Sequence, residues 1–274
     1  MSQQMVIIGA GLAGLSAACT AARQGWQVWL CSSLPSERAQ SVMAEGGINA
    51  ALDTQGQEDS PARHGADTLR AACGLADPNA VLAMTAAASA LVEELADLGV
   101  PFNRTADGQI DLRYFGGQKK KRTAFSQSDT GKQLMTALID AVRRSEAEGT
   151  VHRLNHHDFL TLLHDGPVCT GASLRDTWSG ESCDLPAQAV IIASGGLHGL
   201  FSCTTGSLAD TGAVTAELFR LGLPVANGEF IQYHPTTIAS NGKRMLVSEA
   251  ARGEGGRLWV KKQGRPWYFM EEKY

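Results

Sequence analysis

The first thirty residues alternate short apolar runs with one segment of helical spacing. Met5–Gly9 is a β-branched, apolar run that ends in glycine, and Leu12–Gln24 carries small and apolar residues at helical spacing. A second apolar run follows at Gln27–Cys31. Strand, tight turn, helix and strand in this order predict one βαβ unit with parallel strands.

Three more helices are predicted further along the chain. Asp77 and Pro78 suit the cap and the first turn of a helix that covers 77–99. The others are expected over 128–149 and 210–221, each ending close to a glycine.

The hydrophobic period changes between 158 and 193. Short β-rich runs are separated there by Asp165-Gly166 and Ser179-Gly180, which are hairpin turn dipeptides, and an apolar run at 189–193 ends the segment. This pattern predicts a β-meander that returns to the parallel sheet, and so an α/β fold. From Asn227 onward, turn residues and short strands predict a second domain.

Composition narrows the class of protein. With 274 residues, 43% hydrophobic and a net charge of -4, the chain can bury a large core and has no charge that favours nucleic acid or anionic lipid. No apolar stretch is expected to reach the ~20 residues of a membrane span, and no leader is expected before the first strand, so we predict a cytoplasmic protein. The run 118–122 is expected to be a solvated loop.

The six cysteines are scattered and never form CxxC. Neither a metal site nor a disulfide framework is indicated, and reduced core thiols are expected.

Gly9, Gly11 and Gly14 form a GxGxxG motif between the first strand and the first helix. In this context the motif is typical of dinucleotide binding: the glycines permit the turn, the approach of a pyrophosphate and close helix packing. The acidic residue expected about 20 positions on, for the ribose hydroxyls, is missing. Ser32 and Ser33 stand there and are predicted to serve instead.

Several further motifs occur in one order across essentially all 274 residues. They are GAGLAGL, RAQSVMAEGGINAAL, FGGQKKKRTAF, DTGKQLMTALI, AVIIASGG, EFIQYHPTTI and SEAARGEGG. Together they resemble the flavoprotein subunit of fumarate reductase and succinate dehydrogenase, a family that L-aspartate oxidase also joins. The resemblance implies a glutathione-reductase-like FAD-binding domain over 1–232 and the beginning of a capping domain over 233–274, with a dicarboxylate held between cap and flavin.

The resemblance also implies a set of FAD contacts. The implied contacts are Gly46 and Gly47 beside the isoalloxazine, the backbone near Phe159 at the adenine, and Ser194, Gly195 and Gly196 closing over the nucleotide. Gln40 stands where respiratory members have a histidine bonded to the flavin, and a carboxamide cannot form that bond, so non-covalent FAD is expected. Ala213 replaces an expected aspartate, which removes one polar FAD contact.

Reduction of a double bond conjugated to a carboxylate by hydride from flavin N5 needs donors for the carboxylates and an acid for the second carbon. His234 and Ser248 suit the first task. Glu249 and Arg252, three residues apart, form either a structural ion pair or, as the resemblance implies, part of a proton relay. The resemblance further assigns Gly47, Phe115 and Leu246 to substrate packing.

In the family, the general-acid arginine and a later segment that returns to the flavin domain follow the part matched here. These 274 residues are therefore expected to be an N-terminal portion that is inactive alone. Three functions remain open: a fumarate reductase or succinate dehydrogenase flavoprotein, an L-aspartate oxidase, and a non-catalytic FAD-binding protein. Family members pair with an iron-sulfur subunit and a membrane anchor at the cytoplasmic face of the inner membrane, with haem domains, or with none, and the sequence does not choose.

Overall fold

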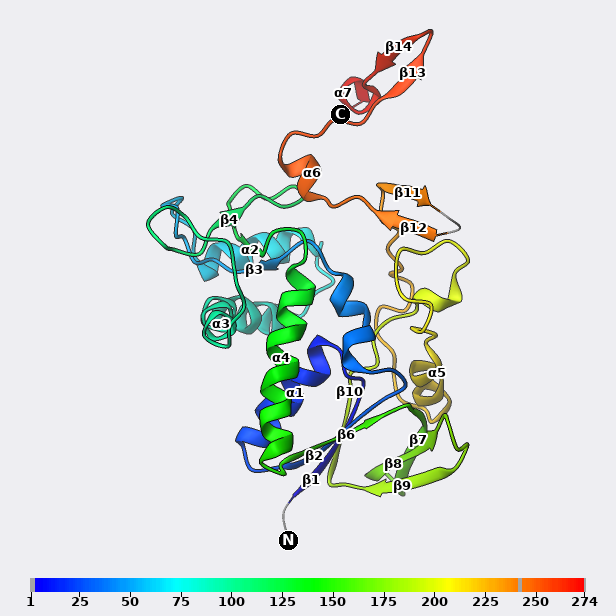
Figure 1. The fold of residues 1–274 in the computed structure, drawn as a ribbon. Helices are drawn as coiled ribbons and strands as arrows, with labels where there is room; N and C mark the ends of the chain where they lie inside the picture. The colour runs from blue at the N-terminus through cyan, green and yellow to red at the C-terminus, as the bar shows by residue number, and fades with distance from the viewer. Residues whose placement is uncertain (1–2, 241–242, 274) are drawn as a thin grey trace. The chain divides into compact units, whose positions relative to one another are not determined.

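The computed structural model describes residues 3–240 and 243–273. The chain forms two compact units, which interleave along the sequence (Figure 1). The first consists of 1–44, 95–101 and 129–245, and the second of 45–94, 102–128 and 246–274. These units do not follow the boundary expected at 232/233, and the assignment of 1–232 and 233–274 to FAD-binding and capping domains stays a prediction.

A four-stranded parallel sheet is the centre of the first unit. Its strands, in spatial order, are β10 (Ala189–Ile192), β1 (Gln4–Ile8), β2 (Gln27–Ser32) and β6 (Val151–Asn155). Val6 and Ile7 of β1 are fully buried, as expected for a strand covered on both faces. The apolar runs at Met5–Gly9, Gln27–Cys31 and 189–193 predicted β1, β2 and β10 correctly. They did not reveal β6, whose sequence VHRLN carries polar residues in three of its five positions.

Helices flank this sheet. The unit contains α1 (Leu12–Arg23), α4 (Thr130–Ala147) and α5 (Ala213–Arg220), with short 3-10 turns at Ser36–Arg38, Gln40–Met43 and His198–Leu200. α1 packs against α4 (Figure 1). The predicted helices are confirmed, but α5 begins three residues later than expected. Asp129 precedes α4 without capping its backbone, because its carboxylate accepts a hydrogen bond from the Gln133 side chain instead, at 3.0 Å.

The predicted β-meander forms a separate antiparallel sheet of the same unit. Its strands are β7 (His157–Asp165), β8 (Val168–Asp176) and β9 (Ser182–Pro186). Ala172 and Leu174 of β8 are fully buried in one cluster with Val6 and Ile8 of β1. The meander therefore closes the core beside the sheet that carries the glycine turn. Further along, β11 (Thr237–Ser240) pairs with β12 (Lys243–Leu246).

The second unit is built from helices and small sheets. Its elements are β3 (Ile48–Asn49), α2 (Pro61–Ala71), most of α3 (Pro78–Asp97), β4 (Leu112–Arg113), β5 (Thr123–Ala124), α6 (Ala250–Gly253), β13 (Val260–Lys262), β14 (Arg265–Trp267) and α7 (Phe269–Lys273). β5 lies between β3 and β4 in an antiparallel sheet. The helix α2 was not predicted, although Ser60 caps it by accepting the Arg63 N–H at 3.2 Å and Pro61 begins it.

The helix α3 corrects one expectation. Among the described residues it is the one helix with the length and composition of a membrane span, with a mean hydropathy of 1.2 over its most apolar window. The expectation that no segment reaches that length was therefore wrong. The helix itself was predicted over 77–99, but its apolar length was not recognised. A single helix of this kind is weak support for a membrane span, because a core helix of a soluble protein meets the same criteria.

Candidate functional site

The glycine turn between β1 and α1 has the geometry that the motif requires. Gly9 has φ +111, and a Cβ there would overlap the Ala193 carbonyl and come within 3.0 Å of the Ser194 nitrogen. A Cβ at Gly14 would overlap the Gly9 carbonyl, so only glycine lets α1 approach β1 this closely. The predicted steric roles of these two glycines are confirmed.

The N-terminus of α1 lies open at this turn. Gly11 is the cap residue and offers no side-chain acceptor, and the first turn holds no acidic residue. The first helical amide, that of Leu12, donates to the Ser41 hydroxyl at 3.2 Å. A helix N-terminus whose cap and first turn carry no acidic side chain favours an anion.

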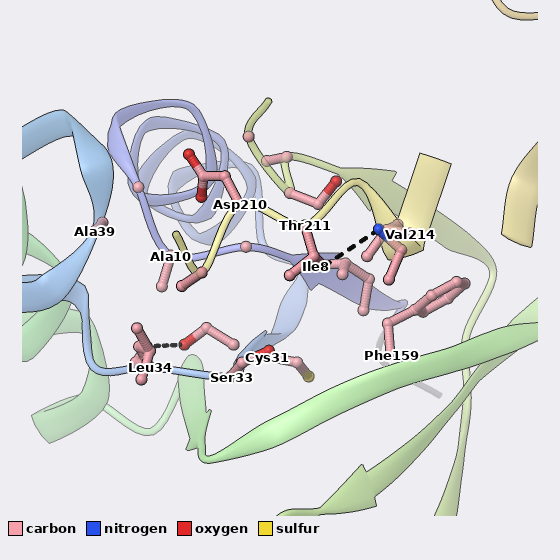
Figure 2. Close-up of a pocket in the computed structure, with 18 of the residues that line it drawn as sticks. Ile8, Ala10, Cys31, Ser33, Leu34, Ala39, Phe159, Asp210, Thr211 and Val214 are labelled. Carbon is pink, nitrogen blue, oxygen red and sulfur yellow. Dashed lines mark hydrogen bonds between the residues drawn. The ribbon is translucent and has the colours of Figure 1, made fainter. Parts of the chain in front are cut away.

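A cavity of about 720 Å³ adjoins the turn within the first unit (Figure 2). Eight of the residues predicted to contact FAD line it: Gly9, Gly11, Ser32, Ser33, Gln40, Phe159, Ser194 and Gly195. Gly14 and Gly196 do not line it. Gly14 acts in helix packing, and Gly196 faces the ring of His198, 3.3 Å from the position of its missing Cβ. Gly46 and Gly47 belong to the second unit.

The end of β2 carries serines where a carboxylate is usual. Ser32 donates its hydroxyl hydrogen bond to the Leu34 carbonyl at 2.7 Å, and Ser33 is exposed (Figure 2). Because the Ser32 hydroxyl already has a partner, Ser33 is the freer of the two hydroxyls for a ribose. Burial next to this turn raises the pKa of the preceding Cys31 thiol to about 12, so that thiol stays neutral.

Asp210 supplies a carboxylate to this cavity that the sequence did not reveal. Its Oδ2 lies 3.1 Å from Nδ1 of His198, and its side chain would touch a Cβ at Gly195, 3.3 Å away. Figure 2 shows Asp210 and Thr211 on the cavity wall, with Val214 and Phe159 packed on the same core cluster. From the sequence, Asp210 was placed only at the start of a predicted helix and was assigned no contact with the cofactor.

Gln40 faces the cavity and joins two distant segments. Its side-chain oxygen accepts the Ser207 N–H at 2.5 Å, across 167 residues of sequence. The carboxamide is thereby held by the protein backbone. Ala213, in place of the expected aspartate, begins α5 with no polar side chain, and its backbone N–H donates to the Thr211 hydroxyl at 3.4 Å.

In the second unit, predicted residues from three separate segments lie against one another. The ring of Phe115 lies against Gly46, where a Cβ would come 2.8 Å from Cζ. The carboxylate of Glu249 lies against Gly116, where a Cβ would overlap Oε2. Arg252 donates to Oε1 of Glu249 at 2.6 Å, and both side chains are about a quarter exposed. The unit thus brings the Gly46 loop, the Phe115 turn and the predicted relay together.

The other predicted catalytic residues have local contacts. Ser248 accepts the Ala250 N–H at 3.3 Å, just before α6. Leu246 is 39% exposed. Nδ1 of His234 lies 2.9 Å from the Thr236 carbonyl oxygen, and His234 is not among the residues that line the cavity of its own unit. Ser248 and His234 belong to different units, so their pairing on one substrate stays a prediction.

A buried ionic cluster in the second unit corrects the solvated-loop expectation at Arg122, while Lys119 of the same run is exposed as expected. The Arg122 side chain is 4% exposed and donates two hydrogen bonds to Asp59, at 2.6 and 2.8 Å. It also forms an ion pair with Asp67 at 2.8 Å. Burial tends to raise the pKa of Asp59, but the hydrogen bonds and charge of Arg122 lower it below its usual value. His64 is 7% exposed beside them, and burial and Arg122 lower its pKa.

Not all of the cysteines are core residues. Cys73, Cys183 and Cys203 are exposed, which corrects the expectation of core thiols for these three. No group of three or more metal-ligating side chains occurs among residues 3–240 and 243–273.

A parallel sheet with a glycine turn, an open helix N-terminus and an adjoining cavity defines a dinucleotide-binding protein. The profile of the FAD binding domain family matches residues 4–273, and the chain belongs to this family. The structural resemblance agrees: an E. coli quinol fumarate reductase superposes with a TM-score of 0.87 at 29% identity, over 97% of this chain and 44% of that one.

Curated relatives give the branch of the family. The chain is 44% identical to the succinate dehydrogenase flavoprotein subunit of Bacillus subtilis (strain 168), over 100% of this chain and 47% of that protein. It is 37% identical to an L-aspartate oxidase of Mesorhizobium japonicum, over 92% of this chain and 48% of that protein. The resemblance stated from the motifs is confirmed, and FAD is the cofactor. The chain spans about half the length of these relatives.

Proposed function

We propose that this chain binds FAD without a covalent bond and forms the flavin site and part of the dicarboxylate site of a fumarate reductase or succinate dehydrogenase flavoprotein. The observation that supports it best is the contact series in the second unit. Gly46 touches Phe115, the neighbouring Gly116 touches Glu249, and Glu249 pairs with Arg252. Residues predicted for flavin, substrate and proton transfer are thus contiguous although they are separated by about 200 positions in sequence.

The residues of the first unit would hold the nucleotide end of FAD. The diphosphate would lie at the α1 N-terminus beside Gly9 and Gly11, where the helix dipole and the backbone amides stabilise negative charge. Ser33 offers a hydroxyl to the ribose, and the backbone beside Phe159 lies in the same cavity. Bound FAD supplies hydride transfer at flavin N5.

The residues of the second unit would handle the substrate and its proton. Phe115 and Leu246 offer apolar contact, while Ser248 offers a hydroxyl donor for a carboxylate. Glu249 accepts and Arg252 donates within one hydrogen-bonded pair, so a proton passed along it stays compensated by the partner charge. The final acid of the family, an arginine, is not assigned to any of these residues. We therefore propose that the chain alone does not turn over.

Partners and location follow the same proposal. A dicarboxylate is the substrate, an iron-sulfur subunit with a membrane anchor is the electron-transfer partner, and the chain acts in the cytoplasm at the inner face of the membrane. The support is the identity to a succinate dehydrogenase flavoprotein subunit, which is by name one part of an assembly. Nucleic acid is not expected to bind a chain of net charge -4.

The second candidate is L-aspartate oxidase, supported by 37% identity to such an enzyme. Purified chain reconstituted with FAD separates the candidates. Fumarate and succinate are expected to perturb the flavin absorption spectrum, and L-aspartate is expected neither to perturb nor to bleach it. Bleaching by aspartate under nitrogen would favour the oxidase. A yellow protein that responds to none of the three would favour a non-catalytic FAD-binding protein, and failure to bind FAD would refute all three readings.

A further inference from the structure

Arg113 holds the backbone of the loop that carries Gly46 and Gly47. It lies on β4, half-buried, and one guanidinium nitrogen donates to the carbonyl of Glu45 at 3.1 Å and to that of Gly46 at 2.7 Å. The guanidinium carbon lies 4.3 Å from the centre of the Phe125 ring. Two consecutive peptide units are thus fixed by one side chain that is itself held against an aromatic face.

The charge of Arg113 is not neutralised by an ion pair within the described part of the chain. Its Nε is buried without a hydrogen-bond partner, and Glu254 acts on it only as a more distant charge. Burial lowers the pKa of Arg113, but a guanidinium stays protonated in proteins. A positive charge therefore lies directly behind the Glu45–Gly46 backbone.

The geometry of the peptide unit fixes where the opposite side of this backbone points. In a trans peptide the N–H lies opposite the C=O, so carbonyls that point to Arg113 direct the N–H groups of Gly46 and Gly47 away from it. Within residues 3–240 and 243–273, neither N–H donates a hydrogen bond. Successive N–H groups oriented in this way form a site for an anion or a strong acceptor.

The loop is also packed closely against β5 at Gly47. Gly47 has φ +120, and a Cβ there would come 2.5 Å from the Ala124 carbonyl oxygen and 2.6 Å from Cγ2 of Thr123. The residues that follow pair with β5. Gly47 is exposed, so its free N–H is accessible to a ligand.

We propose that Arg113 is a positioning residue for the flavin: it holds two peptide units so that the N–H groups of Gly46 and Gly47 donate to the isoalloxazine, and its positive charge polarises both. The inference rests on the proposed function, which puts these glycines beside the ring. Reduction adds electron density to the ring, so fixed donors backed by a positive charge bind reduced FAD more tightly than oxidised FAD. Arg113 thereby raises the reduction potential of the bound cofactor.

The test compares the reduction potential of FAD bound to the full chain with that bound to Arg113→Met and Arg113→Lys, by equilibration with a reference dye. Methionine keeps an apolar side chain of similar length and removes the guanidinium group, with its N–H donors and its charge. We expect the ratio of reduced to oxidised flavin at a fixed potential to fall at least tenfold, about 30 mV for a two-electron couple. Lysine keeps the charge but not the fork, and should give a smaller fall. Arg104→Met, at an exposed arginine whose side chain donates to the Gly108 carbonyl, is the control and should leave the ratio unchanged.

The outcomes distinguish failure of the proposed function from failure of the role of Arg113. Absence of FAD binding by the unaltered chain refutes the proposed function. FAD binding with the same potential in Arg113→Met, in protein whose circular dichroism matches the unaltered chain, refutes the role of Arg113 alone. Should the methionine variant not fold, the lysine variant decides: a potential equal to that of the unaltered chain overturns the inference, and a fall of about threefold or more supports it.

Discussion

Gly116 lies directly against the carboxylate of Glu249, so closely that a methyl group at Gly116 would overlap Oε2. The glycine that follows Phe115 therefore determines where the acidic end of the Glu249–Arg252 pair can lie. The FGG turn and α6 are separated by more than 130 positions in sequence, and their contact shows that the turn is a support for the proposed relay.

Gly116→Ala is expected to displace Glu249 and to weaken its ion pair with Arg252. A partly exposed pair contributes up to about 1 kcal/mol, so we expect a loss of about that size in the free energy of unfolding, measured with urea. Gly117→Ala is the matched control, because Gly117 also has positive φ but its Cβ would meet nothing within 4 Å. In a Glu249→Ala background the excess cost of Gly116→Ala should vanish. Additive costs would contradict this coupling.

Gly11→Ala is expected to weaken FAD binding at least tenfold with little change in stability. Gly11 has φ -82, which alanine adopts without strain, and the new Cβ would lie 3.2 Å from the Ser41 hydroxyl. The methyl would crowd the Ser41 hydroxyl, which accepts the Leu12 amide at the turn where the diphosphate is proposed to bind, so the turn would have to shift. Fluorescence titration with FAD measures the affinity. Gly228→Ala, whose Cβ would meet nothing within 4 Å, should bind as the unaltered chain does, and equal affinity in Gly11→Ala would place the diphosphate elsewhere.

Flavin bound to this chain is expected to be released by acid precipitation. Gln40 lines the cavity and its oxygen accepts the Ser207 N–H, and an amide offers no ring nitrogen to bond a flavin carbon. The supernatant should contain all of the yellow colour, and the denatured chain should show no flavin fluorescence on a gel. Colour retained in the washed pellet would mean that another residue carries a covalent bond.

Acid is expected to destabilise the second unit in two pH windows. The pKa of buried His64 is lowered from about 6.5, so its neutral form is favoured in the folded state; this contribution is complete above pH 6.5 and is lost as pH falls below it. The pKa values of Asp59 and Asp67 are lowered from 3.8, so their contribution is complete above that value and is lost further down.

Thermal unfolding between pH 7 and pH 5 tests the first window. The melting temperature of the unaltered chain should fall as the pH is lowered, and that of His64→Gln should fall less, because glutamine does not titrate. His164→Gln, at an exposed histidine, should follow the unaltered profile. Parallel profiles for all three would show that His64 does not contribute.

The sequence by itself determined the elements that depend on interactions between residues close together along the chain. The apolar runs predicted β1, β2 and β10, because a buried parallel strand must be apolar along its length, and the glycine motif predicted the turn, because only Gly9 tolerates φ +111 against the Ala193 carbonyl. The polar strand β6 was not predicted, because its own sequence lacks the apolar pattern of a buried strand. Its pairing with β2 holds it in the sheet.

Tertiary structure alone decided which distant groups meet. Nothing near Arg113 in sequence indicates that it bonds the carbonyls of Glu45 and Gly46, and nothing in 118–122 indicates that Arg122 is buried between Asp59 and Asp67. Arg122 looked like one more residue of a charged surface loop. A side chain's partners depend on how separate segments pack, and packing is set by the whole core, so a local pattern supplies the residue type and the fold supplies its role.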